Sequence, residues 1–208
     1  MFNGLKSYFT GSLPNKDRAA FSIMLAFGIT GLIASFVLSV EEIILIKNPD
    51  AVLSCSVNVI LNCASVMKTW QASAFGFPNM FIGLMGFPVV ITVAIAGLSG
   101  VRFPKLFMRT AHISFLLGTL FAYWLFFNSL YVIQILCPWC LIVTFSCTML
   151  LSSITGYAIR NNIYGDSHRV SRMTNAFMDK GYYLATIIGW VALMIALVFM
   201  KFGTDLFA

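Results

Sequence analysis

The sequence predicts an all-α integral membrane protein with several spanning helices, and three features of its composition support this fold class. Hydrophobic residues make up 60% of the 208 residues. Charged residues make up 10%, whereas an ordinary soluble domain has about 25%. The mean hydropathy is +0.91. A water-soluble chain of this length cannot bury so much apolar surface, so we expect a membrane protein.

Five apolar segments are long enough to cross a bilayer. A spanning helix needs about 20 apolar residues, because each residue rises ~1.5 Å and the hydrocarbon core is ~30 Å thick. None of the five has an Asp, Glu, Lys or Arg in its interior, and they cover residues 19–40, 78–98, 111–135, 138–159 and 182–200. The first exceeds the ~7–15 residues of a signal-peptide core, so we expect an uncleaved helix. The third and fourth are nearly contiguous, which predicts a very tight turn near Leu136 and Cys137.

The distribution of positive charge orients these segments. The net charge of +6 comes from single Lys and Arg residues that flank the apolar segments, without a basic stripe that would indicate a nucleic-acid partner. With a cytoplasmic N-terminus, ten of the 13 Lys and Arg lie inside, and only Lys47, Lys68 and Lys201 lie outside. The positive-inside rule therefore predicts a cytoplasmic N-terminus and an outer C-terminus. The lack of ionisable residues within the segments argues against a transporter or channel.

This topology divides the chain into four parts. They are a cytoplasmic N-terminal segment (1–18), a four-helix domain (19–159) with an outer loop (41–77), a cytoplasmic basic loop (160–181), and a fifth helix with the outer C-terminus (182–208).

The outer loop is unusually apolar for a solvated connection. Cys63, Met67, Trp70 and Ala74 recur at the spacing of one helix face. We therefore expect a short amphipathic helix that begins near Cys63 and lies on the outer membrane surface.

Four of the five cysteines form two pairs that the predicted topology places on the same, outer side of the membrane. Cys55 and Cys63 lie in the loop, and Cys137 and Cys140 begin the fourth helix as Cys-Pro-Trp-Cys. A helix N-terminus stabilises a thiolate, which is the nucleophile in thiol–disulfide exchange. Two pairs on one face therefore indicate a redox relay that proceeds through mixed disulfides.

The loop pair also sets a geometric requirement. In a straight helix Cys55 and Cys63 would lie ~12 Å apart along the axis, whereas a disulfide needs Cα atoms within about 7 Å. The chain between them must bend, and Asn58 and Asn62 are suitable turn residues.

Each pair also has a simpler interpretation. A loop pair by itself is more often a structural staple, as in a structural tetraspan membrane protein, but a staple leaves Cys137 and Cys140 unexplained. Four cysteines can bind zinc, but no nearby histidine supplements them and one pair lies at bilayer depth. We therefore expect no metal, and we interpret Cys147, two turns beyond Cys140, as an inert packing residue.

Four stretches taken together resemble the vitamin K epoxide reductase family, and its bacterial, actinobacterial-type members most. They are Cys55-Ser-Val-Asn-Val-Ile-Leu-Asn-Cys63, Ser65-Val-Met-Lys-Thr-Trp-Gln-Ala-Ser73, Phe75-Gly-Phe-Pro-Asn79 and Cys137-Pro-Trp-Cys140. The resemblance covers residues 19–159. It implies a four-helix bundle around a quinone of the menaquinone or ubiquinone type, in a bacterial plasma membrane.

The resemblance also implies roles for single residues. Cys55 and Cys63 match the shuttle cysteines, and Cys137 and Cys140 match the pair beside the quinone. Asn79 matches an asparagine that hydrogen-bonds a quinone oxygen. Bacterial members reoxidise an exported thioredoxin-like protein.

Three differences from the family pattern refine this expectation. Animal members have a tyrosine where this chain has Thr144, which favours plain quinone reduction over epoxide reduction. Thr69 stands where the family usually has a serine near the redox centre, and it keeps the hydroxyl. Some bacterial members carry a fused thioredoxin domain, whereas this chain ends at Ala208, so the resemblance implies a separate partner protein.

The quinone pocket should be apolar with few polar groups. We expect the aromatic side chains near the cysteines to line it, with Trp139 and Phe77 as the quinone-binding candidates; the others are Phe75 and Phe81. The fifth helix has no residues that indicate chemistry.

Overall fold

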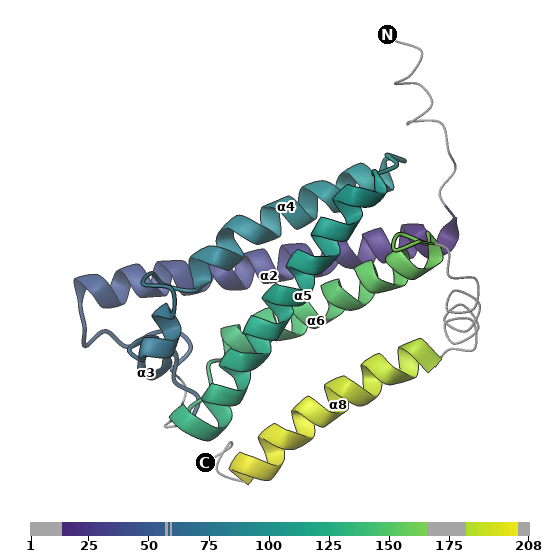
Figure 1. Cartoon of the computed structure of the whole chain (residues 1–208). Helices are drawn as coiled ribbons and strands as arrows, with labels where there is room; N and C mark the ends of the chain where they lie inside the picture. Colours follow the sequence, from purple (N-terminus) through teal and green to yellow (C-terminus); the bar gives the residue numbers. More distant parts are fainter. Residues whose placement is uncertain (1–13, 57, 59, 166–181, 204–208) are drawn as a thin grey trace.

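A computed structural model describes residues 14–56, 58, 60–165 and 182–203 as an all-helical protein (Figure 1). Five long apolar helices are candidate membrane spans: α2 (Asn15–Lys47), α4 (Met80–Leu98), α5 (Lys105–Asn128), α6 (Pro138–Arg160) and α8 (Tyr182–Phe202). Within the described residues the only β pairing is one isolated bridge. The predicted fold class is therefore confirmed.

Helix α2 is the central element of the bundle, because it packs against both α4 and α6, and α5 packs against α6 (Figure 1). Small residues allow the closest approach. A Cβ atom added to Gly31 of α2 would lie 2.3 Å from the ring of Phe87, and one added to Gly83 would lie 2.3 Å from Ser35 Oγ. The α2–α4 contact therefore depends on these glycines.

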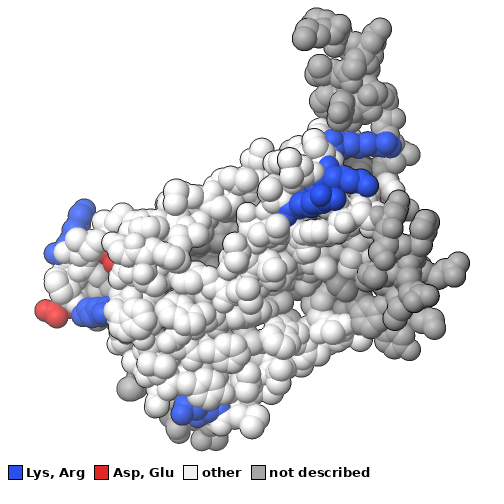
Figure 2. Space-filling model, in the orientation of Figure 1, with Lys and Arg blue, Asp and Glu red and all other residues white. Residues whose placement is uncertain are grey.

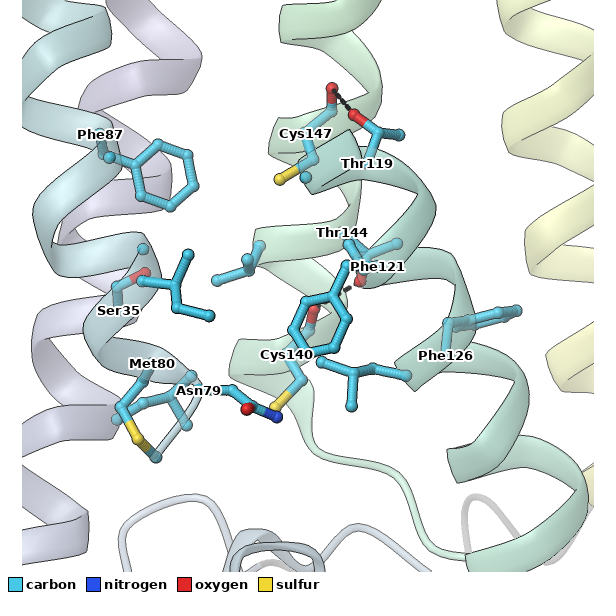
Figure 3. Close-up of a pocket in the computed structure, with 18 of the residues that line it drawn as sticks. Ser35, Asn79, Met80, Phe87, Thr119, Phe121, Phe126, Cys140, Thr144 and Cys147 are labelled. Atoms are coloured by element: carbon cyan, nitrogen blue, oxygen red, sulfur yellow. Dashed lines mark hydrogen bonds between the residues drawn. The ribbon is translucent and has the colours of Figure 1, made fainter. Parts of the chain in front are cut away.

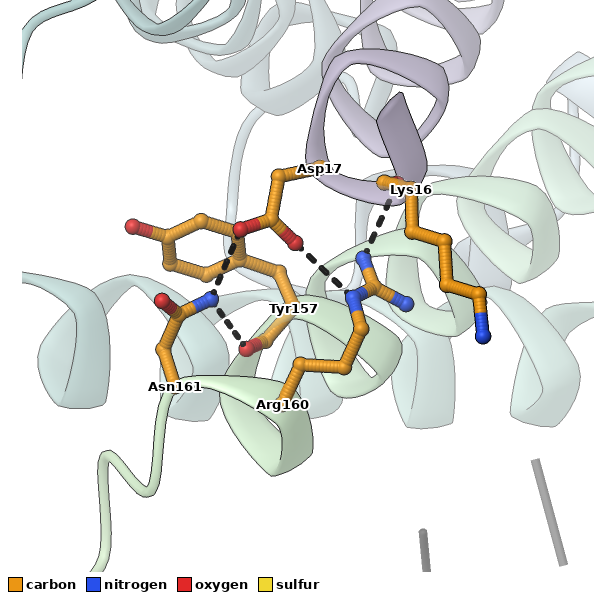
Figure 4. Close-up of polar contacts among 5 residues, drawn as sticks. All are labelled: Lys16, Asp17, Tyr157, Arg160 and Asn161. Carbon is orange, nitrogen blue, oxygen red and sulfur yellow. Dashed lines mark hydrogen bonds and ion pairs between the residues drawn. The ribbon is translucent and has the colours of Figure 1, made fainter. Parts of the chain in front are cut away.

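Polar contacts join α2 to α6 at the end of the bundle opposite the cysteine pairs (Figure 4). Asp17 is buried, and its carboxylate accepts hydrogen bonds from Arg160 Nε at 2.8 Å and Asn161 Nδ2 at 3.2 Å. Arg160 also donates to the carbonyl oxygen of Lys16 at 3.1 Å. These contacts fix the first turn of α2 against the last turn of α6. Lys and Arg side chains lie at the two ends of the helices and leave the middle of the visible face uncharged (Figure 2).

Helix α8 packs beside the four-helix bundle (Figure 1). Trp190 Nε1 donates a hydrogen bond to the hydroxyl of Tyr123 at 2.8 Å. Phe202 is buried with Phe126, and Met194 packs against the same cluster. The fifth span is therefore attached to α5.

Several helices extend beyond the apolar segments that the sequence predicts. Helix α2 continues past residue 40 to Lys47, so Glu41 belongs to a helix and is not the first residue of the outer loop. Helix α5 begins at Lys105 rather than 111, because Pro104 occupies its N-cap position. Parts of the predicted segments 1–18, 160–181 and 182–208 lie outside the described residues.

The predicted tight turn between the third and fourth spans is confirmed. Helix α5 ends in a short π-helical turn, η2 (Ser129–Ile133). Gln134 then adopts a left-handed backbone conformation with φ of 58°. Cys137 follows as the N-cap of α6. The reversal is therefore complete within four residues of η2.

Candidate active site

The outer loop brings Cys55 and Cys63 together. They form a disulfide with a Cα–Cα distance of 5.7 Å. Asn58 Oδ1 accepts hydrogen bonds from the backbone N–H groups of Ile60 and Leu61, at 3.0 and 2.7 Å. This side chain closes the turn that reverses the chain, so the predicted bend is confirmed.

A short helix begins at Cys63, as predicted, but it is not the continuous amphipathic helix that the spacing indicated. Helix α3 (Cys63–Met67) starts after Asn62, whose Oδ1 accepts a hydrogen bond from Ser65 N at 3.1 Å. A separate 3₁₀ turn, η1 (Trp70–Ser73), follows.

The helix break moves the predicted apolar face. Trp70 is 68% exposed whereas Gln71 is buried, and Ala74 is exposed as well. Cys63 and Met67 lie in α3, whereas Trp70 begins η1. The expectation that Cys63, Met67, Trp70 and Ala74 lie on one face of a single helix is therefore wrong beyond Met67.

Backbone pairing places the loop cysteines beside those of α6. Leu61 and Leu136 form the isolated parallel bridge. Asn62 N donates to Leu136 O at 3.0 Å, and Leu136 N donates to Ile60 O at 2.7 Å. The next residues in the two segments are Cys63 and Cys137, and their Sγ atoms lie 3.3 Å apart. That separation is close enough for one sulfur to attack the other.

Cys137 and Cys140 are free thiols at the start of α6. Cys137 is buried, and its sulfur accepts a hydrogen bond from the backbone N–H of Cys140 at 3.3 Å. Pro138 occupies the first helical position, where the missing N–H costs nothing. The free N–H groups of the helix therefore point at Cys137 and can stabilise a thiolate there.

Cys140 lies on the wall of a cavity of about 590 Å³ between α2, α4, α5 and α6 (Figure 3). The wall is almost entirely apolar, and its aromatic side chains include Phe87, Phe121 and Phe126. A size of this order suits one small organic molecule.

The cavity contains some of the predicted site residues and excludes others. Thr69, Asn79, Cys137 and Cys140 line it. Trp139, Phe77, Phe75 and Phe81 do not line it, and a contact of these side chains with a quinone stays a prediction.

The excluded aromatics occupy other positions. Trp139 packs against the cluster that contains Cys55, Cys63 and Cys137. Phe77 is 39% exposed, and Phe75 packs on the ring of Phe121 from outside the cavity, at 5.1 Å between centroids. Sequence spacing places these residues near the cysteines but cannot predict which way each ring points.

Asn79 combines two features of a ligand-binding side chain. Its Nδ2 donates to the carbonyl oxygen of Gln71 at 2.6 Å, whereas its buried Oδ1 has no hydrogen-bond partner in the described structure. Figure 3 draws Asn79 and Cys140 at the same end of the cavity. The amide can accept a hydrogen bond from a hydroxyl through Oδ1 and can donate its second N–H to a carbonyl oxygen. A quinone, in either redox form, fits this cavity.

The hydroxyl groups near Cys140 are engaged with the backbone. Thr69 Oγ1 donates to Val66 O at 2.7 Å, and Thr144 Oγ1 donates to Cys140 O at 2.9 Å. Both line the cavity and both oxygens can still accept a hydrogen bond.

One functional group near the cysteines was not anticipated. Glu41, which is only 4% exposed, places Oε2 2.9 Å from Cys55 Sγ, and its Oε1 accepts a hydrogen bond from Ser54 Oγ. The ligand atoms of Glu41, Cys55 and Cys63 lie within 4.8 Å of one another. The two sulfurs are joined in a disulfide, so they are not thiolate metal ligands in this state.

Comparison with known proteins adds a family assignment to this geometry. Neither the curated proteins nor the solved structures include a match to this chain. The sequence model of the vitamin K epoxide reductase family matches residues 22–155, which is well over half of the chain and includes both cysteine pairs. Enzymes of this family form disulfides and reduce quinones. The chain therefore belongs to the vitamin K epoxide reductase family and is a multi-pass membrane thiol–quinone oxidoreductase.

Proposed function

We propose that this enzyme reoxidises a separate, exported thioredoxin-like protein and passes the electrons through Cys55–Cys63 and then Cys137–Cys140 to a membrane quinone. One observation carries the proposal. Cys63 Sγ lies 3.3 Å from Cys137 Sγ, and Cys140, three residues later, lies on the wall of the apolar cavity. The two pairs and the cavity therefore form a continuous route for electrons.

The first half of the cycle reduces the loop pair. A thiolate of the partner attacks Cys55, and the Cys55–Cys63 bond breaks, so that Cys63 leaves as a thiolate. Cys63 then attacks Cys137 of a Cys137–Cys140 disulfide, and Cys140 leaves as a thiolate. The partner's second cysteine attacks the mixed disulfide on Cys55, which frees Cys55 and releases the oxidised partner.

The second half restores the loop disulfide. Cys55 attacks Cys63 in the Cys63–Cys137 bond, so the Cys55–Cys63 bond forms again and Cys137 and Cys140 are both reduced. The structure, with a loop disulfide and two thiols on α6, has the disulfide pattern of this stage. The α6 dithiol then gives two electrons to the quinone, which leaves as quinol, and the Cys137–Cys140 disulfide re-forms.

Asn79 and Thr69 orient the quinone in this proposal. The free Oδ1 and second N–H of Asn79 pair with a ring oxygen near Cys140, and the Thr69 hydroxyl provides a second polar contact on the wall. Most of the remaining wall surface is apolar, which suits the ring and tail of a quinone.

The proposed location is a bacterial plasma membrane, with the N-terminus in the cytoplasm and both cysteine pairs at the outer face. The distribution of Lys and Arg supports this orientation. Disulfides persist on that side of the membrane. Menaquinone and ubiquinone are the two quinone types to test.

The first experiment measures quinone reduction by the purified protein with a reduced thioredoxin-like protein as donor. The Cys140→Ala variant should lose activity. Cys147→Ala is the matched control, because Cys147 also lines the cavity but lies two turns further along α6, and it should keep activity. An inactive parent protein, with intact disulfides and both quinone types tried, would favour a structural membrane protein with a stapling disulfide.

A further inference from the structure

Glu41 is a buried acidic residue in contact with a reacting sulfur. It lies in α2, six residues before the end of the helix, and is 4% exposed. Its Oε2 is 2.9 Å from Cys55 Sγ. Its Oε1 accepts a hydrogen bond from the Ser54 hydroxyl. The carboxyl group is therefore held in one orientation, with one oxygen directed at Cys55.

Glu41 does not belong to a structural ion pair that would explain why it is buried. Within the described residues the ion pair that the structure forms is Asp17–Arg160, at the other end of the bundle, and Glu41 has no cationic partner. A buried acidic group without such a partner costs free energy unless it is hydrogen-bonded. Glu41 and Ser54 also line a second cavity of about 300 Å³ beside α2, so the carboxyl lies between that cavity and Cys55.

The chemistry of Cys55 requires a proton acceptor. A thiol has a pKa of about 8.5 and is mostly protonated at neutral pH, whereas the nucleophile is the thiolate. Cys137 has the N-terminus of α6 to stabilise its thiolate. Cys55 lies in a non-helical segment and has no helix N-terminus. The nearest polar atom that the structure gives to its sulfur is Glu41 Oε2.

We propose that Glu41 is the general base for Cys55. The inference rests on the proposed function, because it assigns a residue to the step that re-forms the loop disulfide. As Cys55 leaves the mixed disulfide, it takes up the proton that the partner's second cysteine loses when it attacks. In the next step the Cys55 thiol gives this proton to Glu41 and attacks Cys63 in the Cys63–Cys137 bond. The Cys55–Cys63 bond forms, the Cys63–Cys137 bond breaks, and its electron pair leaves on Cys137. Glu41 then returns the proton to solvent.

The titratable groups that face Glu41 come from two elements. Cys55 and Cys63 of the loop have their sulfurs within 4.8 Å of the carboxylate oxygens and of each other. Cys137 lies beside Cys63, with 3.3 Å between their sulfurs, and Cys140 follows one turn later in α6. When Glu41 is removed, these cysteines are the titratable groups that remain around the site. The pH dependence of turnover in the variant therefore reports on them.

The test uses Glu41→Gln, which keeps the shape of the side chain and removes the base. Glu42→Gln is the matched control, because it removes the same charge one residue later on the same helix. Steady-state turnover with reduced thioredoxin-like donor and quinone should fall at least about 100-fold in Glu41→Gln at pH 7. The loss should shrink as the pH rises, because a larger fraction of the thiol then ionises without a base. Glu42→Gln should match the parent protein.

A second readout identifies the step. Acid quenching during turnover, followed by thiol alkylation and mass spectrometry, should show the Cys63–Cys137 mixed disulfide accumulating in Glu41→Gln and not in Glu42→Gln. Glu41→Asp keeps a carboxylate on a shorter side chain, and its turnover should be at least about tenfold faster than that of Glu41→Gln. Thermal unfolding of each variant checks that the bundle remains folded.

Three results would overturn the inference. Glu41→Gln could turn over as fast as Glu42→Gln. It could be slower by the same factor at every pH without accumulating the mixed disulfide, which would mean a packing role. An inactive parent protein would overturn the proposed function and this inference together, whereas an active parent with an unaffected Glu41→Gln would overturn the inference alone.

Discussion

The substitution Gly31→Ala tests the packing of the bundle where α2 meets the cavity wall. The added Cβ atom would lie 2.3 Å from two ring atoms of Phe87 and 2.9 Å from a third. Ordinary van der Waals contact begins at about 3.4 Å, so the ring must move by roughly 1 Å or the helices must separate. Phe87 is only 5% exposed, so neighbouring side chains confine its ring.

The size of the effect follows from this confinement. Overpacking a core costs about 1–3 kcal/mol, and a clash with three atoms of one ring places Gly31→Ala in the upper part of that range. Alanine regains about 1 kcal/mol over glycine within a helix. The net loss should be about 1–2 kcal/mol, and each kcal/mol lowers Tm by about 2–4 °C for a chain of this size. Thermal unfolding in detergent measures the shift.

Gly86→Ala is the matched control, because Gly86 also lines the cavity but a Cβ atom there would meet nothing within 4 Å. It should unfold at the same temperature as the parent or higher. Adding Phe87→Leu to Gly31→Ala removes the clashing ring atoms, so the double variant should be more stable than the sum of the single changes predicts. If Gly31→Ala unfolds together with Gly86→Ala, the described α2–α4 contact is wrong.

Three further predictions address the cavity, the loop and the far end of the bundle. Gly118→Leu extends a side chain into open space on the cavity wall, so the KM for quinone should rise at least about tenfold in steady-state assays with little change in Tm. Asn62→Ala removes the cap of α3, which should cost about 1 kcal/mol, and thiol labelling should show faster reduction of the loop disulfide by dithiothreitol; an unchanged rate would contradict this. Asp17→Asn breaks the ion pair with Arg160; the Asp17 side chain is 6% exposed and that of Arg160 is 22% exposed. Chemical denaturation should show that the free energy of unfolding falls by about 1–3 kcal/mol.

The five spans could be predicted because bilayer thickness sets the length of an apolar segment. Their ends could not, since polar residues continue a helix beyond the hydrocarbon. Helix α2 runs seven residues past its predicted end at residue 40. Helix α5 starts where Pro104 permits a helix to start rather than where the charged residues end.

The candidate cysteines were predictable for a related reason. The spacing of the cysteines is a local property of the sequence, so the two pairs and the bend at Asn58 could be predicted from it. The cavity lining was not predictable, because Phe121 and Phe126 have the same local pattern as any bundle phenylalanine. The backbone pairing of Leu61 with Leu136 joins residues far apart in sequence, and no periodicity indicates it.

Glu41 was missed for a physical reason that also explains how the fold tolerates it. Asp17 and Glu41, the two buried acidic residues of α2, are 24 residues apart, or ~36 Å along a helix axis. That distance exceeds the ~30 Å hydrocarbon core, so both can lie outside the lipid. The search for segments without charged residues therefore identifies the lipid-facing part of α2 correctly. It gives no information about Glu41, which can lie outside that part. Its burial comes from protein, because Ser54 and Cys55 of the outer loop cover it. A carboxyl group that the chain covers with its own redox-active loop is placed to serve the sulfur it touches.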